Sequence, residues 1–458
     1  IPFHCQMTFR LKLPTDVLNL LGLIAQTRGL HSEAVNWFYR AAASAPEHFP
    51  IFFNLGISLS ASGHPIEAIE AYKKVLRLKP DLKEAFFCLG NTYWQIGRDE
   101  EAAEAFENAL KLDADYTDAA VNLAEIKNDE AALQLLAQKN PQDARPFYYL
   151  GRRKFAQQKY SEANLYLQQA DFLQENAEIK TILGETLLFL QKKDEALPFF
   201  YAALRLDPHN SAAALHIADL EAEKANYAEA EKYYKKAGEL NPDSVQMHAN
   251  YANMLCRLKR TLEALEEYRA AVRLEPEQPE LSYNLAIILK TLEEYEQALA
   301  LMFNAFYLAP HHVDWSLNIA ETITLFYAKS HEKALKIAEN WYEKMPENTV
   351  AKHLWAVLNG KSSDNETEYN RLLFDCFAEN YENVLKNISY NVVEKMAEII
   401  PPLKGKVLDL GCGTGLIGEK FKNTDNVFYG IDLSAAMLKL AESKKVYQNL
   451  EHTDALAY

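Results

Sequence analysis

Residues 49–82 read FPIFFNLGISLSASGHPIEAIEAYKKVLRLKPDL, and residues 83–116 read KEAFFCLGNTYWQIGRDEEAAEAFENALKLDADY. These two 34-residue stretches align without a gap, with Leu-Gly at positions 7 and 8, alanine at position 20 and an aromatic residue at position 24. Small residues at positions 8, 20 and 27 let two helices approach closely, and larger residues fill the space between them. The stretch therefore predicts a pair of packed helices that is repeated along the chain.

The same positions recur through most of the chain at a period of about 34 residues. Proline at position 32 ends the second helix of many units, because proline cannot continue a helix. Each pair stacks on the next, so the predicted fold class is mainly α, an α-solenoid superhelix. The matching sets include Leu21-Gly22, Ala34, Phe38, Ala41 and Pro46; Leu183-Gly184, Ala196, Phe200, Ala203 and Pro208; and Leu285-Ala286, Ala298, Met302, Ala305 and Pro310.

The period and its fixed positions resemble the tetratricopeptide repeat. The resemblance implies an array over residues 15–360, with about ten repeats and a capping helix at Thr349–Gly360, after an N-terminal segment at residues 1–14. The unit that begins at Thr117 is about seven residues short, and the unit that begins at Val313 has about two extra residues. We expect a local irregularity at both places.

Composition and charge exclude several classes of protein. The formal charge of −16 opposes a broad nucleic-acid surface, and no apolar stretch reaches the roughly 20 residues that a membrane-spanning helix needs. The five cysteines are an odd number without metal-type spacing, so we expect no disulfide framework and no metal site. His311-His312 is interpreted as solvated surface. These features favour a cytoplasmic protein.

Asparagine occupies repeat position 6 in three consecutive units, as Asn250, Asn284 and Asn318. Repeat arrays of this type mostly dock protein or peptide partners on their concave side. In related arrays, notably that of O-linked N-acetylglucosamine transferase, such a ladder holds a peptide main chain, because a carboxamide both donates and accepts hydrogen bonds. The alternative is that these asparagines bond to local backbone groups. The ladder hypothesis predicts peptide binding along the C-terminal repeats.

A second type of sequence begins after the array. Residues 361–402 form a predicted linker and helical lead-in, and the stretch from Leu373 to Tyr381 resembles the lead-in of methyltransferases that carry tetratricopeptide repeats. On this resemblance Tyr381 reaches a cofactor, and the alternative is an aromatic side chain packed on a sheet. Residues 403–458 then open with the strand KVLDL and the glycine-rich turn GCGTG, which predicts a Rossmann-like α/β unit.

The glycine turn favours one cofactor class over another. A dinucleotide-binding turn would place its third glycine at position 416, which is Leu416 here, and the glycines instead fall at Gly411, Gly413 and Gly415. With Asp409 two residues ahead, the turn resembles motif I of the class I S-adenosylmethionine-dependent methyltransferases. The cofactor implied by this resemblance is S-adenosylmethionine.

The resemblance also implies roles for individual residues. Asp409 and the glycine turn would hold the methionine part of the cofactor. Asp432, at the end of the second strand, would hold the ribose, Leu433 would lie beside the adenine, and Asp454 would receive the adenine amino group.

The sequence and its family resemblance therefore predict an S-adenosylmethionine-dependent methyltransferase whose repeats dock a protein or peptide partner. The methyltransferase fold normally has seven strands, and only three are readable before Tyr458. We therefore expect only the N-terminal half of that domain here, with the catalytic residues beyond it and the natural chain continuing. The alternative is a non-catalytic scaffold with an inactive or truncated methyltransferase-like segment.

Overall fold

The computed structural model describes residues 13–456. The predicted N-terminal segment, residues 1–14, therefore lies almost entirely outside the described residues. The chain divides into two compact units that meet between Lys236 and Ala237.

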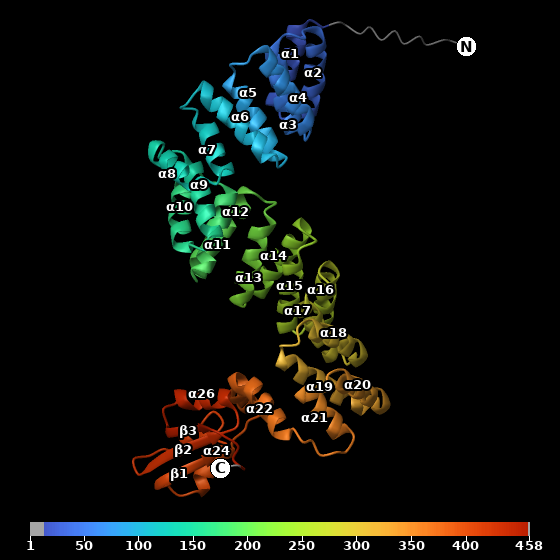
Figure 1. Cartoon of the computed structure of the whole chain (residues 1–458), viewed down its shortest axis with the longest axis vertical. Coiled ribbons are helices and arrows are strands. Elements are labelled where there is room, and N and C mark those ends of the chain that lie inside the picture. Colours follow the sequence, from blue (N-terminus) through green and yellow to red (C-terminus); the bar gives the residue numbers. More distant parts are fainter. Residues whose placement is uncertain (1–12, 457–458) are drawn as a thin grey trace, which may run out of the picture. The chain divides into compact units, whose positions relative to one another are not determined.

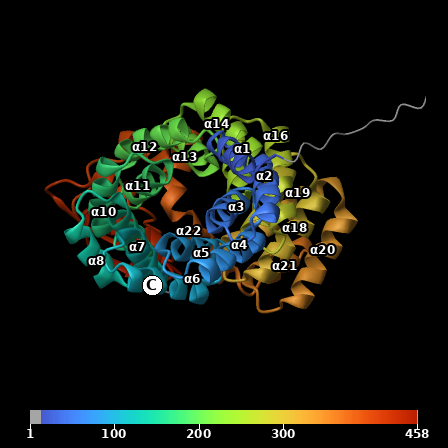
Figure 2. The same ribbon diagram turned by 90° about the horizontal axis from the view of Figure 1, so that it is seen from above.

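The first unit consists of antiparallel helix pairs, and from α1 to α12 the first helix of each pair packs directly on the second. Figures 1 and 2 show this arrangement for α11 and α12. The helices are α1 (Thr15–Thr27), α2 (His31–Ser44), α3 (Phe49–Ala61), α4 (Pro65–Leu78), α5 (Lys83–Gln95), α6 (Asp99–Leu112), α7 (Thr117–Ile126), α8 (Glu130–Lys139), α9 (Ala144–Ala156), α10 (Tyr160–Leu173), α11 (Ala177–Phe189), α12 (Lys193–Leu206), α13 (Ser211–Glu223) and α14 (Tyr227–Leu240), which extends across the boundary.

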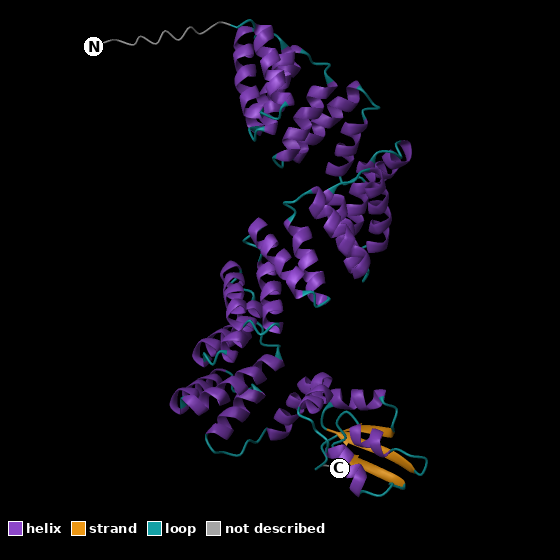
Figure 3. Cartoon of the chain, turned by 180° about the vertical axis from the view of Figure 1, so that it is seen from behind, coloured by secondary structure: helices purple, strands orange, loops and turns teal. Residues whose placement is uncertain are grey.

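The second unit continues the pairs and ends in an α/β segment (Figure 3). Its repeat helices are α15 (Val245–Arg257), α16 (Thr261–Leu274), α17 (Pro279–Thr291), α18 (Tyr295–Leu308), α19 (Val313–Lys329), α20 (His331–Lys344) and α21 (Thr349–Leu358). The lead-in contains α22 (Glu366–Phe377), a 3-10 turn (Ala378–Asn380), α23 (Tyr381–Asn387) and α24 (Val392–Ile399).

Side-chain packing inside the pairs follows the predicted repeat positions. The glycine at position 8 faces the large residue at position 24, and a Cβ atom added to Gly56 would lie 2.6 Å from the ring of Tyr72. The same arrangement pairs Gly90 with Phe106 and Gly184 with Phe200. In these repeats the close contacts leave little room for a larger side chain at position 8, because well-packed cores resist added volume, whereas other repeats have alanine there, as at Ala286.

Both predicted irregular repeats are confirmed by the helix lengths. α7 and α8 have 10 residues each, whereas the helices of regular repeats have 13 and 14. The two extra residues of the unit from Val313 lie in a longer first helix, because α19 has 17 residues. The irregularities therefore change helix length and leave the paired arrangement intact.

The α/β segment contains a parallel three-stranded sheet in the order β1-β2-β3. Its elements are β1 (Gly405–Leu410), α25 (Leu416–Phe421), β2 (Asn426–Asp432), α26 (Ala435–Ser443) and β3 (Tyr447–His452). The strands are parallel, so their carboxyl ends lie at one edge of the sheet. Leu408, Leu410 and Val427 are exposed. This small α/β unit after a helical array agrees with the predicted fold class.

Within residues 13–456, none of the helices combines the length and the apolar character that crossing a bilayer would require.

Candidate functional site

The glycine-rich turn forms the centre of the carboxyl edge. Gly411, Gly413 and Gly415 all have positive φ angles, of 71°, 53° and 85°, which side chains rarely tolerate. A Cβ atom added to Gly411 or Gly413 would meet nothing within 4 Å, so the backbone there borders open space. A Cβ atom added to Gly415 would lie 3.0 Å from the ring of Tyr447, so this position must stay small. The main chain of the turn is thus open at Gly411 and Gly413, whereas Gly415 packs tightly against Tyr447.

Asp432 fixes this turn against the end of β2. One carboxylate oxygen, Oδ2, accepts the backbone N–H of Gly413 at 2.8 Å, and Oδ1 accepts that of Ser434 at 2.8 Å. An ionised carboxylate has about four acceptor positions, so two remain for further donors. Asp432 therefore organises the glycine turn and can still receive hydroxyl groups.

Asp409 is a buried carboxylate at the same edge. Its Oδ2 accepts the hydroxyl of Tyr447 at 2.7 Å. Burial raises the pKa of Asp409, the hydrogen bond from Tyr447 opposes that rise, and the negative charge of Asp432 adds to it. Burial likewise raises the pKa of the Cys412 thiol to about 12, so Cys412 is a neutral packing residue. The carboxyl edge thus holds two carboxylates, Asp409 and Asp432, that are close enough to repel each other.

Leu433 and Asp454 follow the ends of the next two strands. The backbone N–H of Thr453 donates to the carbonyl of Asp432 at 3.1 Å, which brings the segment after β3 beside the end of β2. His452 Nε2 lies 2.8 Å from the carbonyl oxygen of Leu433. Asp454 Oδ1 accepts the N–H of Leu456 at 2.9 Å in a local turn. The structure therefore brings the predicted residues of the three strand ends to one edge.

Tyr381 lies at the start of α23, within electrostatic range of this edge. Burial is the largest cause of the raised pKa of Tyr381, and the charges of Tyr390 and Asp432 raise it further. Tyr381 directly follows the 3-10 turn Ala378–Asn380, which packs against α26, and a role in holding a cofactor stays a prediction.

Sequence reasoning missed the residues that join the lead-in to this edge. Asp375 on α22 accepts the hydroxyl of Ser434 at 2.6 Å and lies 3.3 Å from the backbone nitrogen of Ala436, at the start of α26. Glu382 on α23 pairs with Lys444 at 2.7 Å. No local pattern could reveal these contacts, since their partners lie about sixty residues away along the chain.

The predicted asparagine ladder has mixed surroundings. Asn318 donates through Nδ2 to the carbonyl of Asp314 in its own helix at 3.1 Å, which matches the local alternative. The hydroxyl of Tyr268 donates to Oδ1 of Asn253 at 2.6 Å, Asn284 lies close enough to Tyr268 to influence its pKa, and Asn250 is half-buried. In the first unit, position-6 Asn122 donates to Asn91 of the preceding repeat at 2.8 Å. Peptide binding by Asn250, Asn284 and Asn318 stays a prediction.

Known family models match both the repeat array and the C-terminal α/β segment. Models of the tetratricopeptide repeat match residues 67–97, 83–116, 148–211, 191–254 and 257–310, and a model described as a methyltransferase domain matches residues 407–457. The chain combines a tetratricopeptide-repeat array with a methyltransferase-domain segment. The methyltransferase-domain match at residues 407–457 includes the glycine turn and the acids described above.

One curated relative covers the methyltransferase segment. It is a protein of Bacillus subtilis (strain 168) named "Putative methyltransferase YqeM", which is 36% identical over 73 residues. The match covers 16% of this chain, and the chain spans 30% of the length of that relative.

Solved structures resemble the repeat array at low identity. The tetratricopeptide domain of P58(IPK) is 17% identical with a TM-score of 0.32, and covers 76% of this chain and 97% of its own. Yeast Tom70 is 17% identical with a TM-score of 0.33, over 84% of this chain and 96% of its own. A repeat protein from Parabacteroides merdae is 19% identical with a TM-score of 0.40, over 44% and 82%.

Proposed function

We propose that this protein is an S-adenosylmethionine-dependent methyltransferase whose repeat array docks a protein or peptide partner. The observation that carries the proposal is the carboxyl edge, where a glycine turn with open main chain lies between the acids Asp409 and Asp432. In this proposal residues 15–360 bind the partner and residues 403–458 hold the cofactor. Residues 361–402 connect these two parts.

The charge of the edge supports this cofactor. S-adenosylmethionine carries a positive sulfonium and an ammonium group, and a cation near Asp409 would offset the repulsion between two neighbouring carboxylates. The open space beside Gly411 and Gly413 gives room for the methionine part against the main chain. The remaining acceptor positions of Asp432 suit the ribose hydroxyls, with Leu433 and Asp454 beside the base.

The chain's own residues would mainly bind and orient. S-adenosylmethionine supplies an activated methyl group, and the enzyme contributes alignment of the acceptor with that group. Tyr381 and the lead-in helices would cover the edge and exclude water. The accepting atom belongs to the partner, and the repeats would keep that partner at high local concentration.

The test is isothermal titration calorimetry with S-adenosylhomocysteine on a full-length form that includes the complete methyltransferase domain, with NAD⁺ as the control ligand. Binding of S-adenosylhomocysteine without binding of NAD⁺ supports the proposal. A folded protein that gives no heat with S-adenosylhomocysteine contradicts it, and the non-catalytic scaffold then becomes the better hypothesis.

A further inference from the structure

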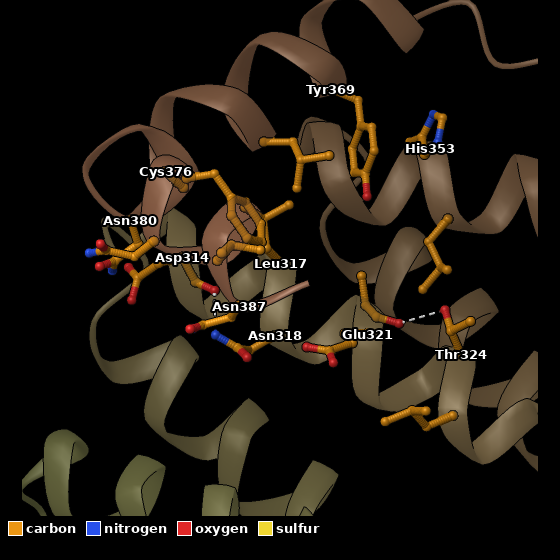
Figure 4. Close-up of a pocket in the computed structure, with 17 residues that line it drawn as sticks. Asp314, Leu317, Asn318, Glu321, Thr324, His353, Tyr369, Cys376, Asn380 and Asn387 are labelled. Carbon is orange, nitrogen blue, oxygen red and sulfur yellow. Dashed lines mark hydrogen bonds between the residues drawn. The ribbon is translucent and has the colours of Figure 1, made fainter. Parts of the chain in front are cut away.

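A pocket of about 750 Å³ lies between the last repeats and the lead-in helices, all within the second unit. α19 and α21 form one wall, and α22, the 3-10 turn and α23 form the other (Figure 4). Its volume falls in the range of about 300–1,000 Å³ that is usual for ligand sites. The two walls come from different parts of the chain, so the repeats alone would not form it.

One end of the pocket is polar and negatively charged. Figure 4 shows Asp314, Asn380 and Asn387 gathered there, with Asn318 next to them. Asp314 is exposed, and the ion contact found for it is weak, at 3.8 Å from His312 Nδ1. The pocket's other carboxylate, Glu321, is already paired with Lys290 at 2.7 Å. Asp314 is thus the carboxylate best placed to receive a new cation.

No lysine or arginine is among the described residues that line the pocket. His353 also lines it and stacks on Tyr369 with ring centres 3.9 Å apart. Burial lowers the pKa of His353, so this ring is neutral at neutral pH and does not balance Asp314. An anionic ligand would therefore find no cationic side chain among the described lining residues and would be repelled by Asp314 and Glu321.

Apolar side chains line a large part of the remaining pocket wall. Leu317 from α19, with Leu373 and Phe377 from α22, provides a surface for an aliphatic chain. Arginine combines such a chain with a planar guanidinium group that has five N–H donors. A carboxylate with carboxamide oxygens around it can accept several of these donors at once.

We infer that this pocket binds an arginine side chain of an extended peptide, with its guanidinium group against Asp314, Asn380 and Asn387. The inference rests on the docking half of the proposed function and adds the chemical class of the partner. The peptide main chain would continue along the repeats past Asn318, which lines the pocket at repeat position 6.

The pocket also adjoins the methyltransferase segment. α22 carries Cys376 and Phe377 on the pocket and Asp375 on the start of α26. Asn380 lines the pocket, and the next residue, Tyr381, is within electrostatic range of Asp432. A peptide held here would therefore be separated from the carboxyl edge only by the lead-in.

The test is fluorescence polarisation of the whole chain with a labelled, acetylated peptide made of three Gly-Leu-Arg-Leu repeats. A matched peptide carries citrulline, which has the shape of arginine without its charge, and a third carries glutamate. We expect the arginine peptide to bind at least about tenfold more tightly than the citrulline peptide, the scale of hydrogen bonds to a charged group, and the glutamate peptide not to bind.

Asp314→Asn should weaken the binding of the arginine peptide about tenfold and leave the affinity for the citrulline peptide unchanged. Glu343→Gln is the matched control, because Glu343 is an exposed carboxylate on neighbouring α20 outside the pocket. Equal affinity for the arginine and citrulline peptides, equal behaviour of the two variants, or no binding of the arginine peptide would overturn the inference. Calorimetry with S-adenosylhomocysteine on the same samples is independent of this result, so failure of the cofactor proposal remains distinguishable.

Discussion

Replacing Asp432 with alanine is the sharpest test of the carboxyl edge, because this carboxylate has two separable tasks. It accepts the N–H groups of Gly413 and Ser434, both at 2.8 Å, and it is proposed to accept the ribose hydroxyls. Asp432→Ala should therefore lower both the stability of the α/β segment and its affinity for S-adenosylhomocysteine.

The two losses can be given magnitudes. A hydrogen bond to a charged group contributes about 1.5–3 kcal/mol, and the half-buried setting of Asp432 favours the lower value for each backbone bond. The α/β segment should thus lose about 3 kcal/mol of unfolding free energy from the two bonds. The loss of the ribose contacts should weaken ligand binding by a further 1.5–3 kcal/mol or so, which is about tenfold to a hundredfold in Kd.

The assay pairs calorimetry with hydrogen exchange, because the helices of the array dominate any global signal. Exchange protection of the amides of Phe428 and Ile431 in β2 reports whether the segment is folded at the temperature of the titration. Asp425→Ala, an exposed acid just before β2 at its amino end, should leave Kd unchanged. If β2 of the Asp432→Ala variant stays protected from hydrogen exchange and the Kd for S-adenosylhomocysteine is unchanged, Asp432 is not the residue that binds the ribose.

Three further substitutions test the packing and the electrostatics. Gly56→Ala should lower the unfolding free energy by about 1–3 kcal/mol in chemical denaturation, since the new Cβ overlaps the ring of Tyr72, and no loss would mean that the helices are less closely packed. Ala225→Gly should raise the stability by about 1 kcal/mol, because Ala225 has a φ of 60° in the turn between helices, and a loss would contradict that strain. Asp409→Asn should stabilise the segment at pH values above the pKa of Asp409 and have no effect well below it. The pKa of Asp409 is raised in the folded protein, so the stability of the wild-type segment falls as the pH rises through that pKa, whereas asparagine does not ionise. The asparagine side chain can still accept the hydroxyl of Tyr447. Hydrogen exchange of β1 across pH measures this, and a pH-independent effect would refute the electrostatic cause.

The repeat fold could be predicted because its decisive contacts join fixed positions within one unit. The contact between Gly56 and Tyr72 spans sixteen residues and recurs wherever the period recurs, so the spacing alone identifies it. The positions of the strands and of Asp432 were predictable for a similar reason, because a buried strand and a glycine turn have strong local signatures. Local sequence patterns are therefore sufficient to predict the repeat helices, the strands and the position of Asp432.

The pocket and the lead-in contacts could not be predicted in this way. α22 belongs to no repeat, so its sequence does not indicate whether Leu373 faces the array or Asp375 faces α26. Asn318 illustrates the same difficulty, since its repeat position alone cannot distinguish a bond to Asp314 in its own helix from a contact with a ligand. Such choices depend on which surfaces meet in three dimensions, which a periodic pattern does not specify.

The carboxyl edge combines an unfavourably placed buried acid with open space beside Gly411 and Gly413, and this combination favours a ligand-binding role over a purely structural one. A buried acid whose pKa is raised by burial and by a neighbouring carboxylate reduces stability at neutral pH, and packing alone would be served better by a neutral residue at position 409. The single hydroxyl of Tyr447 only partly offsets this cost. Groups in such unfavourable environments concentrate at functional sites, where the ligand supplies the missing charge. The ammonium group of the cofactor, which S-adenosylhomocysteine retains, would supply that charge here. Asp409→Asn should therefore stabilise the free segment and weaken the binding of S-adenosylhomocysteine, whereas replacing a purely structural acid would change stability alone.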